Sequence, residues 1–368
     1  MKRVLLLFIS EHSGHHCASL AIEKALHELD PSTETLNINS FNYTNPILEK
    51  VINRAYMGVV KRTPELWDYL YDNPKVLKKT QSLREMIHKF NTGKLKALID
   101  SFSPDTIVCT QAFPCGMMAD CKKTFGLAIP LVGVLTDYAP HSYWIYNNVD
   151  YYIVPSRETG DKLVANGIDI SKIKLFGIPI DSKFRNSLDK ETICSGLGID
   201  SSRPCVLVMG GTQGLGPLKK LTRLLDRSDM DLQLIIACGT NKKLYNALAR
   251  RRYRKNIKVL SYATNIDELM HIADIILTKP GGITTAEAIS KGLPMLIVNP
   301  LPGQEAMNTK FLLNEGVAVK AESPEDVEVL LEELLENRNK LKGMSDRARA
   351  LSKPDSSLDI AKLILGAN

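Results

Sequence analysis

The turn near residue 280, between a buried strand and a helix, restricts the fold of this chain more than any other feature. Residues 278–308 read TKPGGITTAEAISKGLPMLIVNPLPGQEAMN. The Pro-Gly-Gly triplet at 280–282 ends the apolar run DIILT, and a segment of good helix formers, a second apolar run and a polar loop follow. A strand, a tight turn, a helix and a further strand in this order predict a parallel α/β unit.

The same alternation recurs in both halves of the chain. Helix-like segments separate apolar runs that we expect to be strands, at residues 3–9, 106–110, 131–135 and 151–154, and at 205–209, 232–237, 257–260, 274–277 and 295–298. The pattern predicts two facing Rossmann-like, doubly wound α/β domains with an interdomain cleft. Ligands of such domains bind at the carboxyl ends of the strands.

The boundary between the domains is expected at FGIPIDSKFR, residues 176–185, where Gly and Pro follow the last strand of the first half. We therefore expect an N-terminal domain at 1–175, a hinge at 176–185 and a C-terminal domain at 186–350. In families of this architecture the last helix commonly crosses back to the first domain, and residues 351–368 contain a helix-like segment after a proline. Motifs on both sides of the hinge predict closure on ligand binding.

Composition favours a two-domain enzyme without a membrane span. The chain has 368 residues, which is more than one hydrophobic core usually serves, and 44% of them are hydrophobic. Its first apolar run, VLLLFIS, is far shorter than the ~20 residues that span a bilayer and lacks a signal-peptide pattern. Seven cysteines without paired CxxC spacing indicate a reducing cytoplasm, and we expect Cys109, Cys115 and Cys121 to be buried as small apolar side chains.

The glycine turn also predicts a site for a nucleotide sugar. Free backbone N–H groups at a helix start attract phosphate. One helical turn along, Glu287 is placed to accept hydrogen bonds from two ribose hydroxyls, while Gln304 and Glu305 follow the next strand as readers of the sugar hydroxyls. The candidate donor-binding residues here are Gly281, Gly282, Thr284, Thr285, Glu287, Gln304 and Glu305.

A second glycine-rich loop, MGGTQGLGP at 209–217, follows the first strand of the C-terminal domain. Its Gly210 and Gly211 are expected to bring bare backbone close to the donor diphosphate. The loop spells GxxGxG, which is neither the dinucleotide fingerprint nor a Walker loop and argues against a dehydrogenase or a nucleotide-hydrolysing switch. Asp229 and Asp231 form an Asp-x-Asp, but they sit in a turn where acidic residues are common, so we expect no metal there.

Several further motifs, in this order, resemble the family of monogalactosyldiacylglycerol synthases and bacterial processive diacylglycerol glucosyltransferases. They are SGHHCASLAIEKAL, LWDYLYDNP, VLTDYAPHSYW, VDYYIVPS, FGIPI, VMGGTQGLGP and ACGTNKKL. The peptidoglycan lipid-intermediate N-acetylglucosaminyltransferase is similar more distantly. The resemblance implies the GT-B type of fold and inverting transfer of glucose or galactose from a UDP-sugar to diacylglycerol or a glycosylated diacylglycerol. It implies no metal and no cofactor, because helix termini and polar side chains stabilise the leaving diphosphate.

The loop SEHSGHH after the first strand carries the candidate general base. His15 aligns with the glycine-histidine motif of the family, and a neutral imidazole can take the proton of an acceptor hydroxyl. The alternative is a helix-capping or packed histidine. His12, His15 and His16 have no acidic or cysteine partner at zinc-ligand spacing, so a metal site is not expected.

A second polar group lies in VLTDYAPHSYW. Asp137 and His141 follow a predicted strand, and Tyr143 with Trp144 is expected to shape the acceptor or sugar pocket. Asp137 either orients a histidine or is itself the base, and the sequence does not rank these roles. The alternative is a capping aspartate beside core aromatics.

Charge points to an anionic membrane surface as a partner. Residues 50–96 contain eleven Lys or Arg and four Asp or Glu, a surplus of seven in a chain of net charge +6. Aromatic and aliphatic side chains alternate with them, which suits lipid head groups, so Lys61, Arg62 and Trp67 are candidate membrane contacts. We expect a cytoplasmic protein bound peripherally to the membrane. The alternative is a solvated basic face; no nucleic-acid-binding module accompanies the charge.

Two other functions stay open at this point. One is a UDP-sugar transferase that acts on a polyprenyl-linked acceptor; the other is a non-catalytic, membrane-associated protein that binds a UDP-sugar. The residues do not distinguish a glucose from a galactose donor, because the two sugars differ in the configuration of one hydroxyl. Processivity and oligomeric state have no readable signature.

Overall fold

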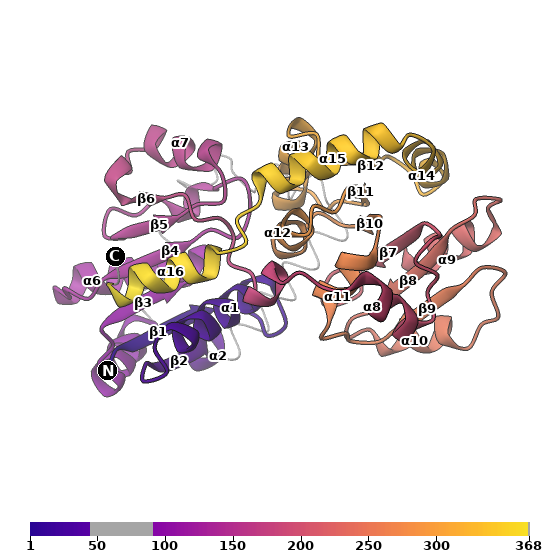
Figure 1. Cartoon of the computed structure of the whole chain (residues 1–368). Helices are drawn as coiled ribbons and strands as arrows, with labels where there is room; N and C mark the ends of the chain where they lie inside the picture. The colour runs from indigo at the N-terminus through magenta and orange to yellow at the C-terminus, as the bar shows by residue number, and fades with distance from the viewer. Residues whose placement is uncertain (45–90, 367–368) are drawn as a thin grey trace. The chain divides into compact units, whose positions relative to one another are not determined.

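The computed structural model describes residues 1–44 and 91–366 and divides into two compact units (Figure 1). Unit 1 contains Met1–Ser182, Pro302–Gln304 and Asp355–Asn368, and unit 2 contains Lys183–Leu301 and Glu305–Pro354. The chain therefore starts in unit 1, builds unit 2, and ends in unit 1.

Unit 1 is built on a six-stranded sheet in the order β2-β1-β3-β4-β5-β6. All five neighbouring pairs are parallel, so each connection must cross a face of the sheet. The strands are β1 (Arg3–Phe8), β2 (Glu34–Asn39), β3 (Thr106–Cys109), β4 (Leu131–Val134), β5 (Tyr151–Ile153) and β6 (Ile173–Lys174).

Helices cover both faces of this sheet. Successive side chains of β1 point to opposite faces: Leu5 and Leu7 pack with α6 and the helical segment 91–102, whereas Val4 and Leu6 pack with α1 and α16. The helices of the unit are α1 (Gly14–Leu29), α2 (Ser40–Thr44), α6 (Ala112–Phe125), α7 (Arg157–Ala165) and α16 (Ser356–Leu365), with short 3-10 turns η1 (Ser142–Trp144) and η2 (Ile170–Lys172).

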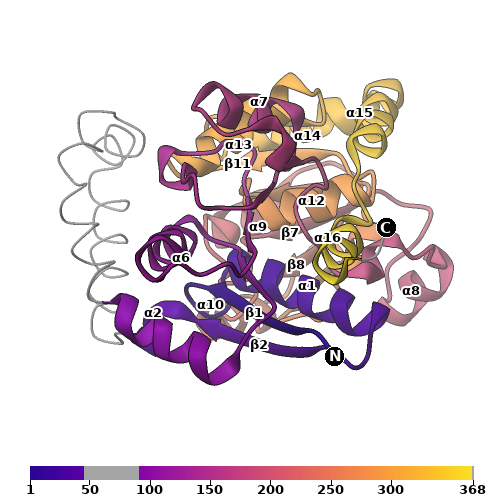
Figure 2. The ribbon, with the colours of Figure 1, turned by 90° about the vertical axis from the view of Figure 1, so that its left-hand side faces the viewer.

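The last helix completes the core of unit 1. α16 lies beside α1, as Figures 1 and 2 show, and buries Leu358, Ile360 and Ile364 against the sheet. The Ser356 hydroxyl donates a hydrogen bond to the carbonyl oxygen of Ile178 at 2.8 Å, which fixes the start of the helix. One face of the first unit is thus closed by residues from the end of the chain.

Unit 2 has a second six-stranded parallel sheet, in the order β12-β11-β10-β7-β8-β9. Strands β7 and β10 lie in its middle and are buried along their whole length. The strands are β7 (Cys205–Met209), β8 (Gln233–Ala237), β9 (Ile257–Leu260), β10 (Ile275–Thr278), β11 (Met295–Val298) and β12 (Ala318–Ala321).

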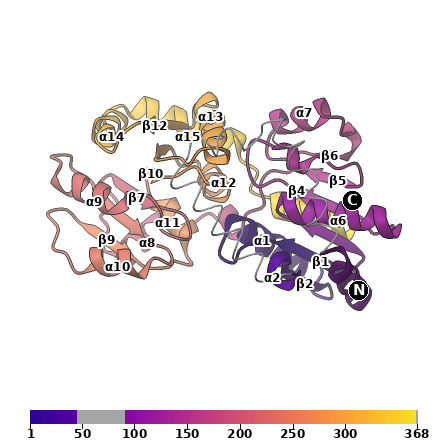
Figure 3. The ribbon, with the colours of Figure 1, turned by 180° about the vertical axis from the view of Figure 1, so that it is seen from behind.

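One face of this sheet packs against α9, α10 and α14, which contribute Leu221, Leu248 and Leu331 to a common core (Figure 3). The helices of the unit are α8 (Lys190–Leu197), α9 (Leu218–Arg227), α10 (Lys242–Ala249), α11 (Ile266–Ile272), α12 (Gly282–Ser290), α13 (Gln304–Asn314), α14 (Asp326–Glu336) and α15 (Arg338–Leu351), with the 3-10 turn η3 (Ser182–Arg185).

All nine predicted strands are confirmed to within a residue at each end, and three of the strands that the structure describes were missed. The missed strands are β2, β6 and β12, and each is an edge of its sheet. An edge strand is half exposed and lacks the continuous apolar run that marks a buried parallel strand. The sequence of β2, ETLNIN, shows this mixture.

The expectation for the cysteines is also confirmed for the three that were singled out. Cys109, Cys115 and Cys121 are completely buried, and all seven cysteines are free thiols. Cys109 ends β3 and Cys115 lies in α6, so the strand-helix connection brings their two thiols together. Burial, with the neighbouring Cys115, raises the pKa of the Cys109 thiol well above its usual range.

Candidate functional site

Each sheet has one point at which its strand order reverses. In unit 1 this switch point lies between β1 and β3, and in unit 2 it lies between β7 and β10. The helices that follow the two strands cover opposite faces and leave a crevice at the carboxyl ends, which is where doubly wound sheets bind ligands. The loops after β1 and β3 in unit 1, and after β7 and β10 in unit 2, are therefore the expected positions of a site within each unit.

His15 lies in the first turn of α1, directly after β1. Ser13 caps this helix: its hydroxyl accepts a hydrogen bond from the backbone N–H of His16 at 3.2 Å and donates one to the carbonyl oxygen of Ile9 at 3.0 Å. Ser10 and His12 adopt positive φ angles of 65° and 58°, which tighten the loop between strand and helix. This capped turn presents the His15 ring at the β1/β3 switch point.

Two threonines that sequence reasoning missed hold the His15 ring. Its Nδ1 lies 2.9 Å from the carbonyl oxygen of Thr110, after β3, and 2.9 Å from Oγ1 of Thr136, after β4. A carbonyl oxygen only accepts, so Nδ1 carries the hydrogen and Nε2 keeps the lone pair. The Thr110 hydroxyl in turn donates to the carbonyl oxygen of His15 at 2.8 Å. The usable signal in the sequence was that Thr110 ends one predicted strand and Thr136 directly follows another.

Burial keeps both histidines of this region neutral. It lowers the pKa of His15 to about 4, although the hydrogen bond to Thr110 acts in the opposite direction. Burial, and to a smaller extent the nearby His15, lower the pKa of His141 to about 3. A proton on either ring would therefore disfavour a proton on the other. At pH 7 the site contains two uncharged imidazoles.

The other predicted residues of this group lie on the segment after β4. The His141 ring meets the Tyr143 ring edge-on, with centroids 5.4 Å apart, and lies 6.4 Å from the Trp144 ring. Trp144 is buried in η1 and Tyr143 is half-buried against the core. Asp137 is half-buried, and the residue before it, Thr136, contacts His15 through its hydroxyl.

The two further histidines of the loop have structural contacts. The His16 ring stacks on Phe8, with centroids 4.2 Å apart, and its Nδ1 lies 3.4 Å from a carboxylate oxygen of Glu11. The rings of His12 and His16 are 6.4 Å apart. Within residues 1–44 and 91–366, no group of three or more His, Cys, Asp or Glu side chains is arranged to hold a metal ion.

The glycine-rich loop after β7 is folded so tightly that side chains are excluded. A Cβ added to Gly210 would stand 2.0 Å from the carbonyl oxygen of Leu215, and one added to Gly214 would stand 2.0 Å from that of Cys238. The backbone N–H of Leu215 donates to the carbonyl oxygen of Gly210 at 2.9 Å, and Gly211 has a φ of +69°. Bare backbone therefore lines the β7 side of the switch point.

Lys279, which sequence reasoning also missed, lies on the β10 side of the same switch point. Its Nζ donates to Oε1 of Glu305 at 2.6 Å, and the two side chains are 21% and 12% exposed. A Cβ added to Gly211 would lie 3.2 Å from Cε of Lys279. The signal in the sequence was a single cation between a buried strand and the glycine turn. Its partner Glu305 is 26 positions away, so the ion pair itself has no local signature.

The turn before α12 offers an open backbone. Gly281 is the N-cap, and a Cβ added there would meet nothing within 4 Å. The hydroxyl of the fully buried Thr285 donates to the carbonyl oxygens of Gly281 and Gly282 at 3.1 and 2.9 Å, so it supports the turn. Asn308, another residue not predicted, donates from Nδ2 to the carbonyl oxygen of Pro280 at 3.0 Å.

The remaining predicted donor residues lie on α12 and at the start of α13. Thr284 and Glu287 are half-buried on α12, and Gln304 is the first residue of α13 and also half-buried. Glu305 follows, and its Oε2 accepts from the backbone N–H of Leu301 at 2.9 Å. Both oxygens of this carboxylate are therefore engaged, one by a cation and one by the backbone.

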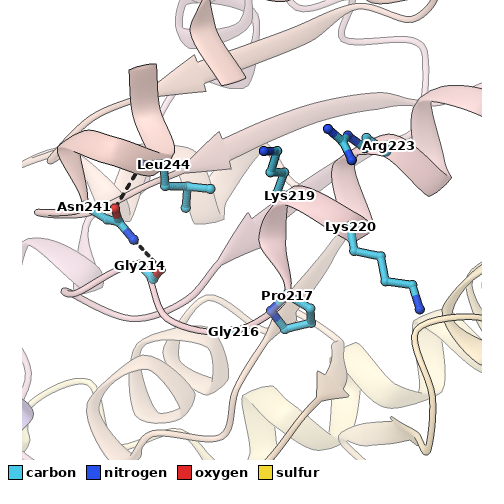
Figure 4. Close-up of a pocket in the computed structure, with 8 residues that line it drawn as sticks. All are labelled: Gly214, Gly216, Pro217, Lys219, Lys220, Arg223, Asn241 and Leu244. Carbon is cyan, nitrogen blue, oxygen red and sulfur yellow. Dashed lines mark hydrogen bonds between the residues drawn. The ribbon is translucent and has the colours of Figure 1, made fainter. Parts of the chain in front are cut away.

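A hollow of about 410 Å³ opens on the other side of the β7 loop, toward β8 (Figure 4). Asn241 bridges its wall by donating to the carbonyl oxygen of Gly214 at 3.3 Å and accepting from the backbone N–H of Leu244 at 2.9 Å. Lys219, Lys220 and Arg223 line it from α9. Lys279 is not among the residues that line this hollow.

The candidate membrane contacts Lys61, Arg62 and Trp67 fall outside the described residues. In the Asp-x-Asp pair, Asp231 forms an ion pair with Arg203, and Asp229 is exposed. Across the part of the chain that the structure describes, no helix is long and apolar enough to cross a membrane.

Comparison with known proteins agrees with these two units. Residues 15–180 match the family model of monogalactosyldiacylglycerol (MGDG) synthase, and residues 205–362 match the C-terminal domain of glycosyltransferase family 28. The chain is 30% identical to the processive diacylglycerol beta-glucosyltransferase of Bacillus pumilus, over 99% of this chain and 94% of that protein. The protein of the same description from Bacillus subtilis is also 30% identical, over 99% and 95%.

Solved structures support the same fold at low sequence identity. MurG of Acinetobacter baumannii has a TM-score of 0.62 at 16% identity, with all of both chains covered. HepE of Anabaena, solved in complex with UDP-glucose, has a TM-score of 0.55 at 13% identity, again over both whole chains. The predicted fold, two doubly wound α/β domains of the GT-B type, is confirmed.

Similarity over almost the whole length to proteins described as processive diacylglycerol beta-glucosyltransferases, the match of each half to a family model and the two parallel sheets lead to one conclusion. The chain belongs to the family of MGDG synthases and processive diacylglycerol glucosyltransferases, and it is a hexosyltransferase.

Proposed function

We propose that this enzyme transfers glucose from UDP-glucose to diacylglycerol, or to an already glycosylated diacylglycerol, with inversion at the anomeric carbon. The relatives with 30% identity are described as processive diacylglycerol beta-glucosyltransferases. UDP-glucose carries its sugar in the α configuration, so a β product corresponds to a single displacement. UDP-galactose is the alternative donor, since the model that matches residues 15–180 is that of MGDG synthase.

The observation that carries the catalytic proposal is the fixed tautomer of His15. Its Nδ1–H is directed at the carbonyl oxygen of Thr110, which leaves the Nε2 lone pair to accept the proton of the lipid hydroxyl as that oxygen attacks the sugar. When the ring takes the proton, the same carbonyl stabilises the charge on Nδ1. Asp137 and His141 complete the candidate catalytic group, and burial keeps the His141 ring neutral at pH 7.

The donor is assigned to the β7/β10 switch point of unit 2. The backbone of Gly210, Gly211, Gly281 and Gly282 approaches the diphosphate, and the N-terminus of α12 faces its negative charge. In this proposal Glu287 accepts hydrogen bonds from the ribose. Thr284 lies beside the diphosphate, Thr285 supports the turn, and Gln304 and Glu305 read the sugar hydroxyls.

The acceptor lipid is assigned to unit 1, and the enzyme to a peripheral position on the cytoplasmic face of the membrane. Support comes from the surplus of seven positive charges at residues 50–96, which include Lys61, Arg62 and Trp67. Tyr143 and Trp144 lie next to His141 and are the aromatic candidates for the acceptor pocket.

The test is transfer of radiolabelled sugar from UDP-glucose, and separately from UDP-galactose, to diacylglycerol in vesicles that contain anionic lipid, with products separated by thin-layer chromatography. We expect a labelled glycolipid from UDP-glucose and little from UDP-galactose. Product from UDP-galactose alone would overturn the sugar assignment. Product only when a polyprenyl-phosphate-linked acceptor replaces diacylglycerol would overturn the acceptor, and UDP binding without any product would indicate a binding protein.

A further inference from the structure

The ion pair between Lys279 and Glu305 connects two parts of the donor site that serve different portions of the donor. On one side, Nζ of Lys279 donates to Oε1 of Glu305 at 2.6 Å. On the other, Cε of Lys279 lies 3.2 Å from the position of a Cβ on Gly211. Lys279 thus lies between the glycine loop proposed for the diphosphate and the carboxylate proposed for the sugar.

The Lys279–Glu305 pair is shielded from water, so the anion that accompanies Lys279 affects the free energy of the site. The Lys279 side chain is 21% exposed and that of Glu305 is 12% exposed. An exposed pair is screened by water and exchanges partners at little cost, whereas a partly buried cation needs an anion beside it. With the site empty, Glu305 is that anion.

Arrival of a diphosphate changes this balance. The diphosphate brings a stronger anion to Gly211, within reach of Lys279, and it also brings negative charge toward Glu305. If Lys279 turns to the diphosphate, Oε1 of Glu305 loses its donor and needs another. The hydroxyls of the sugar are hydrogen-bond donors that can replace it. UDP alone lacks the transferred sugar, so it offers Oε1 of Glu305 no hydroxyl in place of Lys279.

We propose that Lys279 exchanges partners during the reaction, from Glu305 in the empty site to the diphosphate in the donor complex, and back to Glu305 as UDP leaves. The identity of the donor rests on the proposed function. Before transfer, the sugar hydroxyls replace Lys279 as hydrogen-bond donors to Glu305, so both the diphosphate and the sugar of the donor are bound. After transfer, Glu305 competes with UDP for Lys279, which weakens the hold on the product and promotes its release.

The experiment compares the affinities of UDP, uridine and UDP-glucose by titration calorimetry for the wild-type chain and its variants. Lys279→Met is expected to weaken UDP by roughly 10- to 100-fold, as for a lost charged hydrogen bond, and to leave uridine unchanged. Lys279→Arg keeps the charge and is expected to restore most of the loss.

The distinguishing variant is Glu305→Gln, whose amide oxygen still accepts from the backbone N–H of Leu301. Removing the competing charge is expected to strengthen UDP binding by at least about fivefold, the upper end for an exposed ion pair, and to make UDP a correspondingly stronger product inhibitor. It is also expected to reduce the gain in affinity from UDP to UDP-glucose. A merely structural role for Glu305 predicts weaker binding of every ligand.

A matched control is available in the same unit. Lys183 and Asp267 form another partly buried ion pair, 3.0 Å apart and with side chains 29% and 10% exposed, and neither is proposed to bind the donor. Lys183→Met is expected to leave the three affinities unchanged.

Two results would overturn the exchange of partners: equal loss of UDP and uridine in Lys279→Met, or unchanged or weaker UDP binding in Glu305→Gln. Failure of the proposed function would look different. If the UDP results are as expected and diacylglycerol is not glycosylated, the acceptor assignment falls and the exchange stands. If the wild-type chain binds no UDP, both fall.

Discussion

The two switch points of this protein arise from the same reversal of strand order but differ in their electrostatics. At the β1/β3 point of unit 1, His15 is held by two threonines, and burial lowers its pKa to about 4. At the β7/β10 point of unit 2, glycine backbone lies beside a Lys279–Glu305 ion pair. One site has no formal charge on its histidines at neutral pH, and the other is built from charges.

The difference matches what each site is proposed to handle. A group that takes a proton must begin without one, and desolvation of an imidazole secures that. A diphosphate arrives with its charge and needs cations, helix N-termini and close backbone N–H groups. The same strand order thus supports proton transfer in one unit and anion binding in the other, because the loops after the strands differ.

The strongest test of this division is His15→Ala. We expect transfer to fall by about 10²- to 10⁴-fold, as for loss of a general base, with UDP affinity unchanged. His27→Ala is the matched control, since His27 lies in the last turn of the same helix and contacts Thr35. Measured turnover and UDP titration decide the outcome. Wild-type turnover in His15→Ala would remove this residue from the base role.

Gly281→Ala tests whether backbone in unit 2 approaches the ligand. The φ of Gly281 is −70° and an added Cβ meets no protein atom within 4 Å, so thermal unfolding should be unchanged. UDP affinity should fall about tenfold, or ~1.4 kcal/mol, because the methyl group enters the space assigned to the diphosphate.

Gly210→Ala is the contrasting variant. Its Cβ would stand 2.0 Å from the carbonyl oxygen of Leu215, so the loop itself must move and the melting temperature should drop. Unchanged UDP affinity in Gly281→Ala would show that the diphosphate does not approach this turn.

An acid-dependent loss of stability is expected in unit 1. The unfolded chain protonates His15 near pH 6.5, whereas the folded protein does so only near pH 4, so stability is full above 6.5 and falls as pH drops through this window. Urea unfolding followed by tryptophan fluorescence reports unit 1, since Trp144 is buried in its core and unit 2 contains no tryptophan. Burial lowers the pKa of His141 as well, so His15→Gln should reduce the slope without removing it. An equal slope in both proteins would contradict the burial of the His15 ring.

Sequence reasoning located the central strands and the loops that follow them, because buried parallel strands and glycine turns have local signatures. It did not find edge strands such as β2, whose half-exposed pattern resembles a loop. Nor did it find Thr110, Thr136 or Lys279. Their importance depends on partners 95, 121 and 26 positions away, and a threonine or lysine after a strand carries no local mark of such a contact.

The position of α16 has a consequence for synthesis of the chain. Unit 2 needs no residue beyond Pro354, whereas unit 1 needs α16 to cover Leu6 and Ile22. Between them the ribosome makes residues 183–354, which takes about 10–30 s at roughly 5–20 residues per second. Unit 1 is therefore completed after unit 2, and its nascent sheet keeps one apolar face without α16 until residues 183–354 have been made.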